Sequence, residues 1–188
     1  MRRLLLAAVL GLLAGCSTGP GQVDVTNGGE FRFVAGTPAG EVVPEDERQV
    51  APGFEGVLLD GEEFESSQLA GEVAVINFWG SWCPPCRVET PQFSEVSEEY
   101  DDGVQFLGIN VKEMDRQFAD AFVADKGIAF PSLYDPRGEV ALAFRGLNPN
   151  AIPSTIVLDP DSRVAAVYTG EVRQEDLRRV LDRVLAES

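Results

Sequence analysis

Two short apolar runs, Val73–Phe78 and Val104–Val111, lie on either side of a segment with helical composition, Arg87–Tyr100. Runs of this length that are rich in β-branched and aromatic residues are typical of buried strands. The pattern therefore predicts a strand, a helix and a second strand in succession, which is a unit from which α/β sheets are built.

Turn residues divide the chain before and after this unit. An Asp-Gly dipeptide separates Gly53–Leu59 from Glu62–Phe64, and its preference for tight turns predicts a hairpin. Near the C-terminus, Ile156–Leu158 and Val164–Tyr168 are strand-like runs separated by turn residues. We expect these two runs to form a second hairpin.

Two further helices are predicted in the second half of the chain. Asp115 begins a segment in which Phe118 and Phe122 lie one helical turn apart. The last segment has apolar residues at helical spacing: Leu177, Val180, Leu181, Val184 and Leu185. The residues expected outside this face are Glu175, Asp176, Arg178, Arg179 and Asp182. The elements together predict an α/β fold with a mixed central sheet and helices on both faces.

Residues 1–15 have the pattern of a signal peptide. Arg2 and Arg3 precede an apolar run, Leu4–Ala14, that is too short to span a bilayer of about 30 Å. The small residues at its end and the cysteine directly after them, Cys16, resemble the lipobox of bacterial lipoproteins, in which that cysteine carries the lipid. The alternative is a secretory peptide in which Cys16 has no such role.

The segment after Cys16 is predicted to be a tether. Residues 16–49 are rich in Gly, Pro, Thr and acidic side chains, with one strand-like stretch at Phe31–Ala35. We expect the folded domain to comprise residues 50–188.

Charge and composition exclude several classes of function. The 188 residues include 31 acidic and 15 basic side chains and no histidine, for a net charge of -16. Such an acidic chain repels nucleic acid and anionic head groups, so binding to either is not expected. The lack of histidine excludes Ser-His-Asp and Cys-His catalysis and histidine-ligated metals.

The stretch from Trp82 to Cys86 is the most informative motif, because it lies where a predicted strand gives way to a helix. Cys83 and Cys86 at this spacing can close a disulfide, and the N-terminus of a helix stabilises a thiolate on the first of them. Cys83 is therefore the predicted nucleophile, and Cys86 is the predicted resolving thiol, which attacks the mixed disulfide.

Three other interpretations of this cysteine pair are open: a structural disulfide, half of a metal site, and coincidence. A bridge that encloses two residues restricts the unfolded chain little. A structural zinc site needs four ligands, and the sequence has neither a second cysteine pair nor a histidine. We therefore expect no metal and no cofactor beyond the cysteine pair itself.

The segment Phe78–Cys86 resembles the active site of thioredoxin-like proteins, in particular the extracytoplasmic TlpA/ResA-type thiol-disulfide oxidoreductases, and the likeness extends from about Ala51 to the C-terminus. Glu89 matches the active-site glutamate of the ResA-like members, Pro91 matches the proline that bends the first helix, and Ile152–Thr155 matches the segment with the cis-proline.

Further features are similar to the ResA-like group rather than to plain thioredoxin. These are Asn77, where thioredoxin has a buried acid, and an inserted strand and helix at about Phe106–Ala124. The usual Val-Pro-Thr is Ile-Pro-Ser-Thr here, so we expect the substrate-binding edge to differ slightly. The resemblance thus implies a thioredoxin-like fold with this insertion and an N-terminal hairpin.

The resemblance also implies roles for individual residues. Glu89 lies three positions after Cys86, on the same helix face, where desolvation would raise its pKa and let it exchange the proton of the resolving step. A cis bond before Pro153 would turn the backbone of Ile152 toward an extended substrate. The residues expected to contact substrate are Trp82, Pro84, Ile152 and Pro153. The other candidate, Phe130-Pro131, is expected to be trans.

Pro84 and Pro85 lack N–H groups, so two donors that could stabilise the Cys83 thiolate are missing. The N–H of Cys86 and the helix dipole remain. A less stabilised thiolate gives a lower reduction potential, so we expect a reductant, with a thiol pKa in the upper part of the range of about 3.5 to 7.5 that activated cysteines have.

The sequence as a whole is therefore interpreted as a monomeric, lipid-anchored reductase on the extracytoplasmic face of a bacterial membrane. The resemblance implies a CcdA/DsbD-like membrane protein as electron donor and an exported protein with a disulfide as substrate, of which the CxxCH pair of apocytochrome c is one example. The alternatives are a disulfide-forming oxidase, a peroxiredoxin-type peroxidase, which lacks a CxxC, and a carrier of Cu(I).

Overall fold

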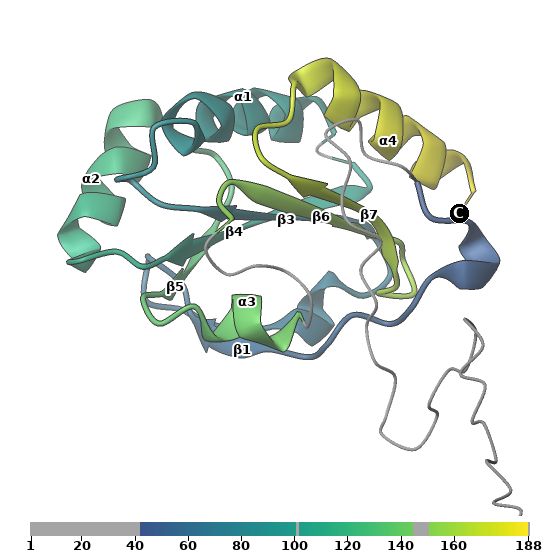
Figure 1. Ribbon diagram of the computed structural model, residues 1–188, viewed down its shortest axis with the longest axis horizontal. Coiled ribbons are helices and arrows are strands. Elements are labelled where there is room, and N and C mark those ends of the chain that lie inside the picture. The colour runs from purple at the N-terminus through teal and green to yellow at the C-terminus, as the bar shows by residue number, and fades with distance from the viewer. Residues whose placement is uncertain (1–41, 101, 145–150, 188) are drawn as a thin grey trace, which may run out of the picture.

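A five-stranded mixed sheet forms the centre of the computed structural model, which describes residues 42–100, 102–144 and 151–187 (Figure 1). Its strands lie in the order β5-β4-β3-β6-β7. Their bounds are β3 Val73–Trp79, β4 Val104–Val111, β5 Ser132–Asp135, β6 Ser154–Leu158 and β7 Val164–Thr169. β3, β4 and β5 are parallel, whereas β6 pairs antiparallel with both β3 and β7. The predicted mixed sheet is confirmed, and β3 is buried along its whole length.

Helices α1 (Cys86–Glu99) and α4 (Gln174–Ala186) cover one face of the sheet (Figure 1). Phe93 of α1 and Leu177 and Leu181 of α4 are fully buried in the core on this side. The prediction for α4 was wrong at one position, because Asp176 is buried rather than outside the packed face. Arg173 and Arg179 both donate hydrogen bonds to its carboxylate, which makes this burial tolerable.

The opposite face carries the predicted hairpin and a short helix (Figure 1). The hairpin strands are β1 (Glu55–Val57) and β2 (Glu63–Glu65), and a short 3-10 helix, η2 (Ser66–Leu69), follows them. Helix α3 (Glu139–Ala143) packs beside them on the same core. The prediction of helices on both faces is therefore confirmed, although α3 and β5 were not predicted individually.

Helix α2 (Arg116–Lys126) follows β4, as the resemblance implied. The side chain of Asp115 caps its first turn by accepting a hydrogen bond from the N–H of Gln117, and Gly127 ends it in the left-handed conformation, with φ of 62°. Phe122 is buried, whereas Phe118 is 51% exposed, so only one of the two aromatic residues belongs to the core.

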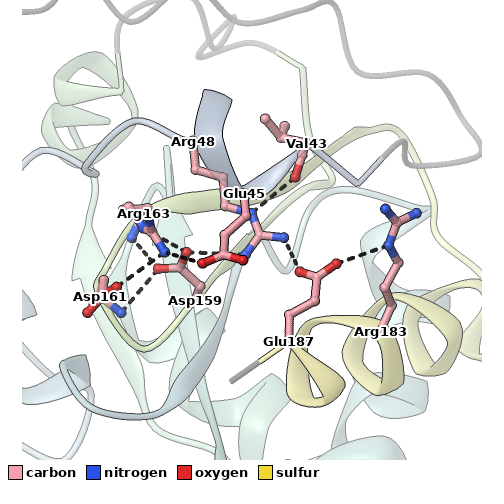
Figure 2. Close-up of polar contacts among 8 residues, drawn as sticks. All are labelled: Val43, Glu45, Arg48, Asp159, Asp161, Arg163, Arg183 and Glu187. Atoms are coloured by element: carbon pink, nitrogen blue, oxygen red, sulfur yellow. Dashed lines mark hydrogen bonds and ion pairs between the residues drawn. The ribbon is translucent and has the colours of Figure 1, made fainter.

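The described chain begins with a segment that packs on the outer edge of β7. Val42 pairs with Ala166, and Val50 pairs with Arg163. Between them, Glu45–Glu47 form a 3-10 helix (η1), and the side chain of Arg48 is buried in a cluster of charged groups (Figure 2). The tether was expected to end at 49, and this boundary needs correction, because residues 42–49 already belong to the folded domain.

Several predictions lie outside the described residues. They are the signal peptide at 1–15, the lipidation site Cys16, the strand-like stretch Phe31–Ala35 and most of the tether. Within the described part of the chain, no helix is both long enough and apolar enough to cross a membrane.

Candidate active site at the start of helix α1

The loop from Gly80 to Pro85 joins the end of β3 to the start of α1 and carries the reactive pair. Cys83 and Cys86 form a disulfide with an S–S distance of 2.01 Å and a Cα–Cα distance of 5.3 Å. The N–H of Cys83 donates to the carbonyl of Gly80 at 3.1 Å, which closes a turn before the first cysteine, and the carbonyl of Cys83 accepts from the N–H of Arg87 at 3.1 Å. The predicted pair is thus linked at the N-terminus of the helix.

Both cysteines are buried, Cys86 at 0% and Cys83 at 3% exposure, in a cluster that also contains Trp79 and Phe122. The N–H of Cys86 lies 3.3 Å from the Sγ of Cys83, where it would donate to a thiolate after reduction. This arrangement suits attack by Cys83 and resolution by Cys86, and the two roles stay predictions.

Glu89 is the buried acid of the site. It is fully buried one helical turn after Cys86, and its two carboxylate oxygens accept hydrogen bonds from Asn77 Nδ2 at 2.8 Å and from the N–H of Val172 at 2.7 Å. Burial raises the pKa of Glu89 from 4.5 to about 7, although both hydrogen bonds oppose the rise and the charge of Glu171 adds to it. Glu89 can therefore take up and release a proton near neutral pH.

The cis bond implied by the resemblance is present between Ile152 and Pro153. Pro153 directly precedes β6, whose first residue, Ser154, pairs with Phe78 near the end of β3. No other peptide bond in the described residues is cis, so Phe130-Pro131 is trans as expected. The segment lies at the same end of the sheet as the cysteine loop, and contact of Ile152 and Pro153 with substrate stays a prediction.

Trp82 and Pro84 flank Cys83 and are both exposed. The indole N–H of Trp82 donates to the carbonyl of Val111 at 3.3 Å, so this ring is held against the end of β4 although it is 48% exposed. The two residues form an apolar surround for Cys83 that a client could contact.

Three polar residues around the loop, Ser81, Glu113 and Arg87, were not predicted from the sequence. Ser81 donates hydrogen bonds to Glu113 through both its N–H and its hydroxyl, and its carbonyl accepts one from Arg87. Glu113 lies just after β4, and the carboxyl ends of adjacent parallel strands meet at one edge of a sheet. Its position after β4 could therefore have indicated that Glu113 lies near the cysteine loop.

Among the described residues, no group of three or more His, Cys, Asp or Glu side chains is arranged to hold a metal ion.

Comparisons with known proteins find a matching family and similar sequences. The model of the AhpC/TSA family matches residues 48–167. The thiol-disulfide oxidoreductase ResA of Geobacillus kaustophilus is 33% identical over an alignment of 138 residues, which covers 71% of this chain and 75% of that protein.

Two solved structures are similar over most of the fold. A DsbF homologue from Corynebacterium diphtheriae has a TM-score of 0.76 and 35% identity and covers 82% of this chain and 98% of its own. A secreted thiol-disulfide isomerase from Corynebacterium glutamicum has a TM-score of 0.77 and 34% identity, with 84% and 97% covered.

Proposed function

Because the chain belongs to the AhpC/TSA family of thioredoxin-like proteins and is a thiol-disulfide oxidoreductase, we propose that it works as a reductase of disulfides in exported proteins. The observation that carries this proposal is the Cys83–Cys86 disulfide at the start of α1, with the buried Glu89 one turn further along the helix. Its redox group is this cysteine pair, with no separate cofactor.

The reduced pair supplies two electrons and two protons. The Cys83 thiolate attacks one sulfur of a substrate disulfide, and the other substrate sulfur leaves as a thiolate that takes up a proton. Glu89 accepts the proton of the Cys86 thiol, and the Cys86 thiolate then attacks Cys83 Sγ. The second substrate sulfur leaves and is protonated in its turn, so the substrate becomes a dithiol and the protein holds the Cys83–Cys86 disulfide.

The donors around Cys83 support the proposed direction of electron flow. Pro84 and Pro85 have no N–H. Among the described residues, the hydrogen bond to Cys83 Sγ that the structure shows comes from the N–H of Cys86. A thiolate with few donors is less stable, so the reduced form gives up its electrons more readily and the potential is lower. This favours a reductant over a disulfide-forming oxidase.

The cellular setting of the proposal rests on the N-terminal sequence and on the similar proteins. The protein from Corynebacterium glutamicum is described as secreted. We place this protein outside the cytoplasm, held at the membrane by a lipid on Cys16, working as a monomer and without nucleic acid. In an oxidising compartment the pair needs a membrane electron donor of the CcdA/DsbD kind. Apocytochrome c with an oxidised CxxCH pair is the client we propose.

The peroxidase and copper-carrier alternatives are less well supported. A peroxiredoxin-type site does not have a partner cysteine three residues away, whereas Cys83 is bonded to Cys86. The chain has only 2 methionines and no histidine to add to two thiolates in a Cu(I) site.

Trapping the reaction intermediate tests the proposed function. With Cys86→Ser the resolving step is blocked, so the reduced protein should accumulate a covalent mixed disulfide with a peptide that carries an oxidised CxxCH pair. Cys83→Ser is the matched control and should form none. Trapping by both variants, or by neither, would contradict the proposal.

A further inference from the structure

Ser81 is held from two sides at the start of the cysteine loop. Its N–H donates to Glu113 Oε2 at 3.0 Å and its hydroxyl donates to Glu113 Oε1 at 2.9 Å. Its carbonyl accepts a hydrogen bond from Arg87 Nη1 at 3.0 Å. The N–H, the hydroxyl and the carbonyl of Ser81 are therefore all bound by side chains, one from the segment after β4 and one from α1.

Two features of the position of Glu113 are energetically unfavourable: its burial and the backbone conformation that precedes it. It is only 6% exposed, and Asn110 Nδ2 donates a third hydrogen bond to its Oε2 at 3.1 Å. The chain reaches it through Lys112, whose φ of 53° lies in the left-handed region that is unfavourable for a residue with a Cβ. Burial of a carboxylate is also unfavourable unless hydrogen bonds compensate, as these three do. This arrangement aims the carboxylate at the loop that holds Cys83.

The position of Cys83 depends on this loop. The thiolate gains from the N–H of Cys86 and from the helix dipole only while its sulfur stays near the helix start, and hydrogen bonds weaken steeply when their geometry is lost. With proline at 84 and 85, neither residue offers an N–H to a displaced sulfur. Since Ser81 lies two residues before Cys83, the contact with Glu113 limits how far Cys83 can move once the disulfide opens.

We propose that Glu113 is a positioning residue for thiol-disulfide exchange, which acts through Ser81 to hold Cys83 against the N-terminus of α1. This inference rests on exchange at the Cys83–Cys86 pair. It is independent of the direction of electron flow and of the client.

The test measures the pH dependence of Cys83 alkylation by iodoacetamide in the fully reduced full chain, with peptide mapping to separate Cys83 from Cys86 and Cys16. In Glu113→Ala the apparent pKa of Cys83 should rise by about one unit, because a hydrogen bond to a charged group stabilises it by about 1.5 kcal/mol or more. For a thiol of pKa near 7, the rate at pH 7 should then fall about fivefold. Glu113→Gln keeps an acceptor for the Ser81 N–H and should stay within about twofold of the unsubstituted protein.

Three results would overturn the proposal. An unchanged pKa in Glu113→Ala would mean that the residue only stabilises the fold. Equal downward shifts in Glu113→Ala and Glu113→Gln would mean that its charge acts directly on Cys83 without positioning the loop. Additive effects of Glu113→Ala and Ser81→Ala in the double variant would mean that Glu113 does not act through Ser81.

A control variant and the single variant at Ser81 complete the test. Asp120→Ala removes a half-exposed carboxylate on α2 and should leave the alkylation profile unchanged. If Glu113→Ala does not fold, Ser81→Ala replaces it in the test. Loss of the Ser81 hydroxyl alone should still raise the pKa of Cys83, and an unchanged pKa would contradict the proposal. Alkylation depends on the Cys83 thiol alone, whereas mixed-disulfide trapping also depends on a substrate. The alkylation prediction can therefore fail while trapping succeeds, and trapping can fail while the alkylation prediction holds.

Discussion

Glu89 shows how burial sets the chemistry of one side chain. Its two hydrogen-bond donors favour the charged carboxylate, yet desolvation outweighs them and raises its pKa to about 7. An exposed glutamate would be almost fully ionised at neutral pH and would return a proton poorly. The buried position on α1 therefore gives the site a carboxyl group that can take up and release a proton near neutral pH, as the proposed exchange requires.

This raised pKa predicts a pH-dependent change in stability. Glu89 loses its proton near pH 4.5 in the unfolded chain and near pH 7 in the folded chain. Between these two pH values the folded state binds more protons than the unfolded state, so the free energy of unfolding falls as pH rises. Glu89→Gln, which cannot ionise, should match the unsubstituted protein at pH 4 and exceed its free energy of unfolding by about 3 kcal/mol at pH 8. Urea unfolding at the two pH values measures this.

Glu98→Gln is the control, because Glu98 is exposed on the same helix. It should show no comparable gain at pH 8. If Glu89→Gln gave the same stability difference at both pH values, the pKa of Glu89 would not be raised in the folded protein.

Residues of the site could be predicted from the sequence where a local motif marks them. Cys83, Cys86 and Glu89 lie within one short segment, and helical spacing places Glu89 near the second thiol. Ser81 and Glu113 are 32 positions apart and meet only because β3 and β4 are adjacent in the sheet. Such a contact leaves no local pattern in the sequence.

Among the elements, the start of α1 is the one expected to set the properties of the Cys83 thiolate. Pro85 has φ of -66° and ψ of -33°, which are helical values that alanine also adopts. Pro85→Ala should therefore keep the backbone and add an N–H at the helix start. A hydrogen bond to a thiolate of about 1.5 to 3 kcal/mol would make the reduction potential about 30 to 60 mV less negative.

Pro91→Ala is the matched control for Pro85→Ala, since it replaces a proline further along the same helix. Equilibration with dithiothreitol buffers measures both potentials. The Pro91 variant should keep the potential of the unsubstituted protein, and an equal shift in both variants would show that helix stability, rather than a donor at the thiolate, sets the potential.

Elements were predictable in proportion to the length of their apolar pattern. β3 and β4 are apolar runs of 7 and 8 residues, and both were predicted nearly to their ends. β5 and α3 have only 4 and 5 residues, too few to show a period, and they gain their order from packing on the sheet. Asp176 broke the pattern of α4 because two arginines bind its carboxylate.

At the scale of the whole molecule, a cluster of charged groups joins the two ends of the described chain (Figure 2). Arg48 donates to the carbonyl of Val43 at 3.0 Å and to Asp159 at 3.2 Å, and it also contacts Glu187 after α4. Arg163 binds Asp159 from the other side at 2.9 Å. Because β6 runs from the active-site end of the sheet toward Asp159, this cluster lies at the end remote from Cys83.

Arg48→Ala should lower the free energy of unfolding by about 3 kcal/mol, since the Arg48 side chain is 2% exposed and its loss leaves Asp159 with one cation fewer in the interior. Arg183→Ala, at a half-exposed side chain that also contacts Glu187, should cost less than about 1 kcal/mol. Urea unfolding compares the two. Equal losses of unfolding free energy in the two variants would show that the buried cluster adds nothing beyond a surface ion pair. A changed alkylation rate of Cys83 in Arg48→Ala would show that the two ends of the sheet are coupled.

The reduction potential of the Cys83–Cys86 pair shows whether this pair is a reductant, as proposed. Equilibration of the purified protein with glutathione or dithiothreitol buffers should give a value near or below that of thioredoxin, about -270 mV. A value near that of DsbA, about -120 mV, would contradict the account, because it would identify a protein that forms disulfides in its clients.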